Sequence, residues 1–258
     1  MNVKQLLDLT GKVSVVTGGT GFYGKPISEG LAEAGAHVVI ASRNRQRCEG
    51  WAQELEGRGL SASGDGLDQG SESSILEFCD RVWKQFGAVD VLVNNSVART
   101  MRAYTDPLET WERSMVVNST GFFAISRAFV DRMMERGQGA VVNIGSIQSV
   151  VAPNFGNYAG TDMTTPPDYH FHKHGMIGLT KYLAAWAGPQ GVRVNAIAPG
   201  GLALGGEKDP FLSQYCSNTF LGRMAQYDDI KGSVVFLASE ASAYVTGHTI
   251  LLDGGYCA

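Results

Sequence analysis

Short runs rich in valine and isoleucine alternate along this chain with longer segments of helical periodicity, and no other feature limits the fold so strongly. Each apolar run has four to six residues, the length of a strand that is buried on both faces. Strand and helix in alternation predict right-handed crossovers, and therefore an α/β fold with a doubly wound parallel sheet flanked by helices. The predicted strands are Val13–Val16, His37–Ala41, Val89–Val93, Ala140–Ile144, Val192–Ile197 and Thr249–Leu252, and the predicted helices are Ile27–Glu33, Arg45–Leu55, Ser73–Phe86, Leu108–Glu135, Tyr169–Trp186 and Asp228–Leu237.

Size and charge are those of one globular domain over residues 1–258. A chain of 258 residues can bury a stable core without disulfides or a structural metal. Its 21 basic and 25 acidic residues give a net charge of −4, so no strong field attracts nucleic acid or anionic lipid. Four cysteines lie apart without a C-x-x-C pair, and no run approaches the roughly 18 apolar residues of a membrane span. We therefore expect a cytoplasmic protein that acts on a small molecule.

The first predicted strand runs directly into a glycine-rich turn, Thr17–Gly24, which opens a helix. Gly19, Gly21 and Gly24 satisfy G-x-G-x-x-G in the context that the dinucleotide fingerprint requires. Glycines permit the tight turn and let backbone N–H groups and the helix N-terminus approach a pyrophosphate. The turn predicts a Rossmann-type dinucleotide site, and the alternative is a sharp strand-to-helix turn without a ligand.

The end of the second predicted strand favours NADP(H) over NAD(H). NAD-specific folds usually place an acidic residue there to bind the ribose 2′-hydroxyl, whereas this chain has Ser42 and Arg43, with Arg45 and Arg47 close behind. A guanidinium binds a 2′-phosphate through charge-assisted hydrogen bonds. The alternative is that the arginines form a solvated helix start, which fits Arg47 better than Arg43.

Eight motifs at strand ends and on helices stand in the order typical of one family. They are Thr17-Gly18 with Gly24, Asp68, Asn94-Asn95, Asn118, Ser146, Tyr169-x-x-x-Lys173, Asn195 and Pro199-Gly200. With them the chain resembles, from about Leu9 to Gly255, the compact single-domain branch of the short-chain dehydrogenase/reductase superfamily. The resemblance implies an NAD(P)-dependent oxidoreductase that interconverts a secondary alcohol and a ketone, with a substrate loop at about residues 202–221. Phe22 departs from the pattern, because that branch usually has its middle glycine there.

The resemblance also implies roles for individual residues. Tyr169 would exchange the proton, Lys173 would lower the pKa of Tyr169 and bind the nicotinamide ribose, and Ser146 would orient the substrate oxygen. Asn118 would fix a helix kink and a water relay to Lys173. The residues expected to bind the cofactor are Thr17, Gly18, Gly19, Thr20, Gly21, Phe22, Tyr23, Gly24, Ser42, Arg43, Asp68, Asn94, Tyr169, Lys173, Pro199, Gly200 and Leu202.

A second tyrosine competes for the role of proton donor. Ser146 and Tyr169 are 23 residues apart, more than is usual in the family, because residues 160–166 look inserted, and Tyr158 lies nearer the common spacing. Four residues after Tyr158 stands Asp162, whereas four after Tyr169 stands Lys173, and a cation is what lowers the pKa of a phenol. Pro167 predicts a helix start that places Tyr169 and Lys173 on one face. We therefore predict Tyr169.

Three histidines, at positions 170, 172 and 174, surround this helix start. His170 and His174 share a face as metal-binding pairs do, but no carboxylate or cysteine is placed to complete a shell and the family mechanism requires no metal. We expect no metal, and histidines that face solvent or the substrate loop.

The substrate is less constrained than the chemistry. Arg99 and Arg102 follow the predicted strand Val89–Val93 and could meet an anionic substrate, and the substrate loop lacks a long apolar run. The inserted segment resembles relatives that act on sugars. We prefer a sugar, polyol or sugar acid over a 3-oxoacyl thioester. Two alternatives from other classes are a nucleotide-sugar epimerase, suggested by Gly18-x-x-Gly21-x-x-Gly24, and a non-catalytic dinucleotide sensor, although the chain keeps Tyr169 and Lys173.

Two predicted helices, Leu108–Glu135 and Tyr169–Trp186, correspond to those that pair between subunits in the family. Both carry apolar stripes wider than one sheet face covers. We expect a homotetramer, or a homodimer.

Overall fold

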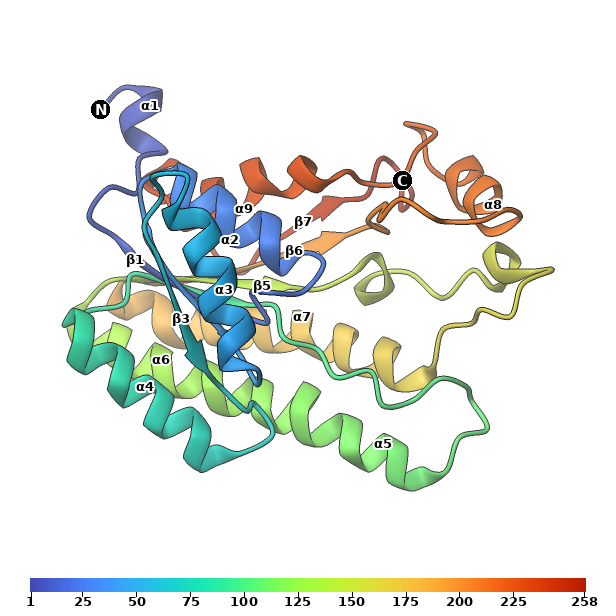
Figure 1. The fold of residues 1–258 in the computed structure, drawn as a ribbon, viewed down its shortest axis with the longest axis horizontal. Coiled ribbons are helices and arrows are strands. Elements are labelled where there is room, and N and C mark those ends of the chain that lie inside the picture. The colour runs from blue at the N-terminus through green and yellow to red at the C-terminus, as the bar shows by residue number, and fades with distance from the viewer.

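A single parallel sheet of seven strands forms the centre of the computed structural model, which describes residues 1–258 (Figure 1). The strand order is β3-β2-β1-β4-β5-β6-β7, so the chain winds outward from β1 first in one direction and then in the other. The predicted doubly wound α/β fold is confirmed. The strands are β1 (Val13–Thr17), β2 (His37–Ser42), β3 (Ala62–Gly66), β4 (Val91–Asn94), β5 (Gly139–Ile144), β6 (Val192–Pro199) and β7 (Thr249–Leu252).

Helices cover both faces of the sheet (Figure 1). On one face lie α2 (Gly24–Glu33), α3 (Arg45–Glu56) and α9 (Lys231–Ala238), and on the other lie α4 (Glu72–Phe86), α6 (Phe122–Arg136) and α7 (Pro167–Ala187). The remaining helices are α1 (Val3–Leu6), α5 (Leu108–Met115) and α8 (Phe211–Ser217). No helix of the structure is both long and apolar enough to cross a membrane.

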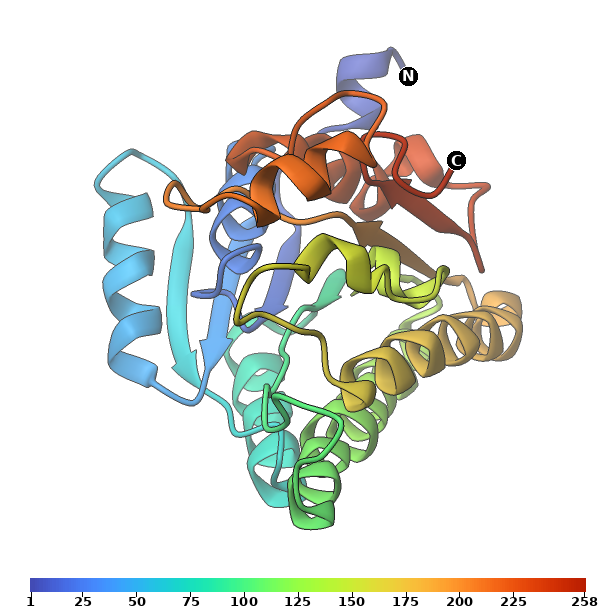
Figure 2. The same ribbon diagram turned by 90° about the vertical axis from the view of Figure 1, so that its right-hand side faces the viewer.

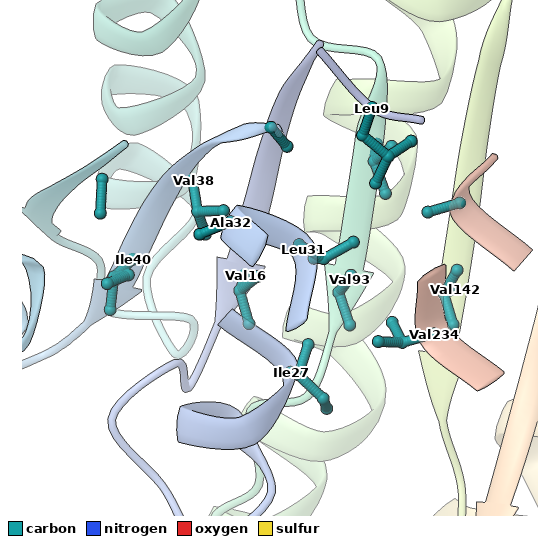
Figure 3. Close-up of a cluster of buried hydrophobic side chains, with 14 of the residues drawn as sticks. Leu9, Val16, Ile27, Leu31, Ala32, Val38, Ile40, Val93, Val142 and Val234 are labelled. Carbon is teal, nitrogen blue, oxygen red and sulfur yellow. The ribbon is translucent and has the colours of Figure 1, made fainter. Parts of the chain in front are cut away.

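Alternate residues of each strand enter two separate cores, because successive side chains point to opposite faces of a sheet. Val16 packs under α2, while its neighbour Val15 packs under the helices of the other face. Figure 3 shows Ile27 of α2 near Val16, and Val234 of α9 beside a strand residue of the same cluster. Burial of both faces explains why the predicted strands read as continuous apolar runs instead of alternating ones.

Strand β3 was missed in the sequence because its residues, Ala-Ser-Gly-Asp-Gly, are poor strand formers. The structure shows why glycine stands there: a Cβ at Gly64 would lie 2.2 Å from the backbone nitrogen of Glu49. Helix α3 therefore packs directly against the backbone of β3, and the close contact depends on a residue without a side chain.

The predicted helix Leu108–Glu135 is continuous but not uniform. Between α5 and α6 the chain makes a π-helical turn, η1 (Val116–Gly121), which contains Asn118. The expected irregularity at Asn118 is thus a widened turn in the helix.

Ligand-sized space is expected where β1 and β4 lie side by side, because there the connections from the strand ends leave in opposite directions. Beyond the same edge lie α8 and the short 3₁₀ helix η3 (Phe155–Tyr158), which contact each other through the rings of Tyr158 and Phe211 at 5.7 Å (Figure 2). Segments 40 and more residues apart thus meet above the sheet.

A buried carboxylate fastens α2 to its neighbours. Glu29 is 7% exposed and accepts hydrogen bonds from Arg58 at 2.9 Å, Lys231 at 2.8 Å and Tyr227 at 2.8 Å. Mainly because of the hydrogen bond from Arg58, and although burial opposes it, the pKa of Glu29 falls to about 2. Its neighbour Glu33 is exposed and shares two of these cations.

We predict that Glu29→Gln lowers the free energy of unfolding at pH 7 by roughly 1–3 kcal/mol, since three hydrogen-bond donors lose the charge of their buried acceptor. The folded pKa lies below the ordinary value of 4.5, so this stabilisation is complete above about pH 4.5 and is lost as the pH falls toward 2. Urea unfolding of both proteins at several pH values measures the difference. Glu33→Gln is the matched control, with an expected loss below about 1 kcal/mol at its exposed position, and equal losses for the two variants would contradict the prediction.

Candidate active site

The glycine-rich turn is shaped by close backbone contacts. Gly18 has φ +61°, and a Cβ at Gly24 would lie 2.1 Å from the carbonyl oxygen of Gly18. Helix α2 begins at Gly24 without a side-chain cap and without an acidic residue in its first turn. Its first N–H groups and positive dipole end therefore fit the pyrophosphate of a dinucleotide.

The ends of β1 and β4 are fastened to each other across the sheet. The Thr17 hydroxyl accepts hydrogen bonds from the backbone nitrogens of Asn95 at 3.0 Å and Ser96 at 3.1 Å. The Asn95 amide in turn donates to the carbonyl of Gly18 at 2.9 Å. Asn95 was not predicted as a site residue, although its position directly after a strand and opposite Thr17 marks it. This contact holds the glycine-rich turn beside the catalytic strand ends.

The arginines after β2 differ in what they contact. Arg45 pairs with Glu49 at 2.8 Å and lies 3.7 Å from Asp65, whereas Arg43 is exposed and makes no ion pair. Ser42 lies at the strand end with its hydroxyl 2.9 Å from the Cys48 sulfur. Arg43 is therefore the cation at this strand end that is free to bind a phosphate.

Two other residues expected at the cofactor have their side chains engaged. Asn94 is 2% exposed and donates to Ser126 at 3.0 Å and to Asn143 at 2.9 Å, so its amide points into the protein and only its backbone stands at the strand end. Asp68 is exposed and accepts a hydrogen bond from the backbone nitrogen of Gly70 at 2.9 Å. Its second carboxylate oxygen makes no hydrogen bond within the chain.

The remaining residues of the expected cofactor site lie at the rim of the turn and at the end of β6. Thr20 and Tyr23 are half-buried, and the ring of Phe22 is 64% exposed. Pro199 ends β6, followed by Gly200, and Leu202 pairs with Ala225. The predicted substrate loop contains a helix, α8, that the sequence did not indicate.

Asn118 is buried and tied to the strand end beside it. Its amide group donates to the Ala98 carbonyl at 2.7 Å and accepts from the Ala98 nitrogen at 2.8 Å. The same amide donates to the Ser114 hydroxyl at 2.9 Å, which donates to the carboxylate of Asp168 at 2.5 Å. Since Asp168 directly precedes Tyr169, this chain of hydrogen bonds links the π-helical turn to the start of α7.

Ser146, Tyr169 and Lys173 come together at the carboxyl end of β5. The Ser146 hydroxyl lies near enough to the Tyr169 phenol to lower its pKa. Lys173 is 4% exposed; its Nζ donates to the Ile144 carbonyl at 2.6 Å and lies 5.7 Å from the centroid of the Tyr169 ring. Burial, together with the charge of Arg99, lowers the pKa of Lys173 to about 7.

In the protein by itself, burial decides the pKa of Tyr169, and the expected effect of Lys173 on it stays a prediction. Burial raises the pKa of Tyr169 above its ordinary value, and the nearby Ser146 hydroxyl and the charge of Arg99 only partly oppose this. Lys173 points its ammonium group at a carbonyl, and its own pKa is lowered by the same burial. Tyr169 is thus a protonated phenol near neutral pH, the form that donates a proton to a carbonyl oxygen.

Tyr158 occupies a different place at the rim of the site. Its ring stacks on Phe211 of α8 at 5.7 Å, and Gln148 lies beside its hydroxyl. Gln148 accepts a hydrogen bond from Thr165 at 2.9 Å, so it ties the inserted segment to the catalytic loop. No lysine accompanies Tyr158, as the sequence indicated.

One of the three histidines is buried, contrary to expectation. His172 is 4% exposed and meets the Tyr169 ring edge-on at 5.3 Å, so the expectation that it faces solvent or the substrate loop was wrong. Burial, reinforced by the Lys173 charge, lowers the pKa of His172 to about 3. The ring is therefore neutral packing beside the tyrosine. His170 and His174 lie on a common face, with ring centroids 6.4 Å apart.

Arg99 brings a positive charge to the open side of the site. Its guanidinium carbon lies 5.8 Å from the centroid of the Tyr169 ring. The side chain is exposed and makes no ion pair. Arg102, three residues on, is exposed as well but has no ring beneath it.

Comparison with known proteins matches this geometry to one family over almost the whole chain. A family profile described as Enoyl-(Acyl carrier protein) reductase matches residues 23–257. D-threitol dehydrogenase of Mycolicibacterium smegmatis is 34% identical over 256 residues, covering 96% of this chain and 94% of that protein. The 3-oxoacyl-(acyl-carrier-protein) reductase FabG of Aquifex aeolicus is 32% identical over 256 residues, covering 96% and 98%.

A solved structure shares the fold closely. The gluconate 5-dehydrogenase of Burkholderia cenocepacia, determined in complex with NADP and tartrate, superposes with a TM-score of 0.90 at 30% sequence identity. The superposition covers 99% of this chain and 98% of that one.

We predict that Tyr169→Phe lowers kcat by about 10²–10⁴-fold, the usual effect of removing a general acid. Tyr158→Phe should leave kcat within about threefold and change KM at most, since Tyr158 stacks on Phe211 at the rim and Lys173 lies near Tyr169 instead. Steady-state kinetics of the two variants, with folding checked by circular dichroism, decide between them. The reverse pattern would require the catalytic assignment to move eleven residues, from Tyr169 to Tyr158.

Proposed function

Because the chain belongs to the short-chain dehydrogenase/reductase superfamily, we propose that it is an NADP(H)-dependent dehydrogenase of a sugar acid. The substrate in this proposal is a small polyhydroxylated molecule with a carboxylate, oxidised at a secondary alcohol. The names of two relatives, a threitol and a gluconate dehydrogenase, support a sugar-like substrate. Arg99 is the observation that carries the choice of an acid over a neutral polyol.

The catalytic groups act on the substrate oxygen. Ser146 and Tyr169, whose hydroxyls lie near each other, both donate to that oxygen, and Tyr169 passes a proton to it in reduction or removes one in oxidation. The nicotinamide, when bound, supplies or accepts the hydride. Lys173, once protonated, favours the phenolate form of Tyr169 by its charge. A lysine pKa of about 7 makes this protonation easily reversible near neutral pH.

Arg99 suits a substrate carboxylate because of its position and because no acidic side chain of the protein pairs with it. Most other arginines already pair with an acid, as Arg136 does with Asp90 at 3.0 Å. Arg99 instead stands over the edge of the site, close to the Tyr169 ring. A guanidinium binds a carboxylate through two parallel hydrogen bonds, and an arginine without an intramolecular partner can do so without breaking another ion pair.

We predict that Arg99→Gln raises KM for gluconate about 10- to 100-fold, as expected for the loss of a charge-assisted hydrogen bond. KM for the neutral polyol threitol should change less than about threefold. Arg102→Gln is the matched control, since that arginine is exposed on the same segment without contacting the Tyr169 ring. Wild-type activity on threitol alone, or equal effects of Arg99→Gln on both substrates, would contradict a sugar-acid substrate.

Oxidised NADP⁺ is the preferred cofactor in this proposal because of Arg43. We predict that Arg43→Ala raises Kd for NADP⁺ about 10- to 100-fold, the effect of losing a phosphate contact, and leaves Kd for NAD⁺ unchanged. Titration by intrinsic fluorescence measures both constants. Arg47→Ala, an exposed and unpaired arginine on α3, serves as the control. Similar Kd values for the two cofactors in the wild type would show that Arg43 points into solvent.

A 3-oxoacyl thioester is the second candidate, favoured by the similarity to the reductase of Aquifex aeolicus. Gln148 and the exposed Asn154 line a pocket beside Tyr158, and the exposed Arg99 lies near the Tyr169 ring; these polar groups argue for the sugar acid. Reduction of acetoacetyl-CoA by NADPH, followed at 340 nm, tests the thioester directly. Binding of cofactor without turnover of either class would instead identify a dinucleotide sensor.

We also propose a homotetramer, built partly on the outer face of α7. Phe171, Tyr182 and Trp186 are about 60% exposed there, and a Cβ at Gly178 would have no atom of the same chain within 4 Å. Aromatic rings around a groove without side chains suit close packing of a second helix. We predict a mass near four times 27.6 kDa in light scattering. Gly178→Arg should fold normally and give a smaller species, and a wild-type monomer would contradict the proposal.

A cytoplasmic location completes the proposal. All four cysteines are free thiols, and Cys48 and Cys79 are buried. Unpaired thiols are the usual state in a reducing compartment.

A further inference from the structure

One peptide group beyond β6 is held on both sides by tyrosine hydroxyls. The carbonyl of Gly200 accepts a hydrogen bond from Tyr23 at 2.9 Å, and the N–H of Gly201 donates to the hydroxyl of Tyr215 at 2.6 Å. This carbonyl and this N–H belong to the same peptide bond. Tyr23 stands at the start of α2 in the glycine-rich turn, and Tyr215 lies on α8. The Gly200–Gly201 peptide thus connects the glycine-rich turn with α8.

The two glycines are fitted to this arrangement. A Cβ at Gly200 would lie 2.8 Å from the Tyr215 hydroxyl, and one at Gly201 would lie 2.7 Å from the Met224 side chain. The outer backbone groups are bonded too, since the Gly200 nitrogen donates to Leu252 at 2.9 Å and the Gly201 carbonyl accepts from Ala225 at 2.9 Å. Every backbone polar group of this dipeptide therefore has a partner, which fixes its orientation.

Tyr215 connects this peptide with the expected substrate side. It is 6% exposed, and its ring lies 5.8 Å from Phe211, which in turn stacks on Tyr158. The same ring stacks on Tyr256 at 5.2 Å. Burial raises the pKa of Tyr215 to about 12 and also raises the pKa of Tyr23, so both hydroxyls keep their protons at any working pH.

We propose that Tyr23 and Tyr215 are positioning residues that couple cofactor binding to the placement of α8 through the Gly200–Gly201 peptide. When α8 moves, Tyr215 shifts the N–H of Gly201. The carbonyl of the same peptide is bonded to Tyr23, so the movement reaches the glycine-rich turn. The inference rests on the proposed function, because it takes the dinucleotide to bind at the glycine-rich turn and the substrate to bind under α8. It adds that a residue of the substrate helix contributes to cofactor affinity without touching the cofactor turn.

A double-mutant cycle on Kd for NADP⁺, titrated without substrate, tests the coupling. Tyr23→Phe and Tyr215→Phe should each raise Kd about 3- to 10-fold, the effect of one lost hydrogen bond. The double variant should be no weaker than the weaker single variant, because breaking either side frees the same peptide. Tyr215→Phe should also raise KM for the sugar acid while leaving kcat within about threefold.

Tyr227→Phe is the matched control, since it too loses the hydrogen bond of a partly buried tyrosine hydroxyl, but to Glu29 at 2.8 Å and not to the Gly200–Gly201 peptide. It should lower Tm without changing Kd for NADP⁺. The coupling would be overturned if the fold-change in Kd of the double variant equalled the product of those of the two single variants, or if Tyr215→Phe left Kd unchanged. Either result would count against it even if the enzyme oxidises sugar acids. Conversely, an inactive panel of sugar acids would overturn the substrate assignment while the cycle still reports on the peptide. A wild type that binds neither NADP⁺ nor NAD⁺ would overturn both.

Discussion

The close approach of α2 to the turn that precedes it is the contact on which the rest of the site depends. With 2.1 Å between the Gly18 carbonyl and a Cβ built at Gly24, no other residue type allows α2 to begin where it does. This start places the helix N-terminus over the end of β1, where the Thr17 hydroxyl also holds the end of β4. The cofactor turn, the β4 end that continues to Arg99, and Tyr23 all take their positions from this contact.

The sequence predicted most of the fold because both faces of the sheet are covered, so apolar runs and helical periods are strong signals. The grouping of Ser146 with Tyr169 and Lys173 came from the family resemblance, and helical periodicity added that Tyr169 and Lys173 lie on one face. The sequence did not predict β3, whose Gly64 is chosen by contact with α3 and not by strand propensity. Burial is likewise a tertiary property, which is why the raised pKa of Tyr169 was not predicted and the place of His172 differed from expectation.

Cations at the site fall into two groups with opposite surroundings. Lys173 is buried and keeps a single hydrogen bond to the Ile144 carbonyl, so the protein lowers its pKa and disfavours the charged form. Arg43 and Arg99 are exposed and make no ion pair. The buried cation suits a part in proton exchange, while the exposed ones suit attraction for anionic groups of ligands.

The π-helical turn η1 has a consequence for how this active site tolerates change in chain length. It contains a residue more than an α-helix would need over the same rise, and its ends are held at two places: the Gln69 side chain donates to the Val117 carbonyl at 3.0 Å, and a Cβ at Gly121 would lie 1.9 Å from the Gln69 carbonyl. Deleting one residue here would let α5 and α6 merge into a regular helix, but one half would rotate by about 100° relative to the other. Either Asn118 would turn away from Ala98 or Gly121 would turn away from Gln69. The orientation of Asn118 is therefore encoded by the number of residues in the helix as much as by their identity, and a length change far from any ligand would reach the catalytic cluster as a rotation.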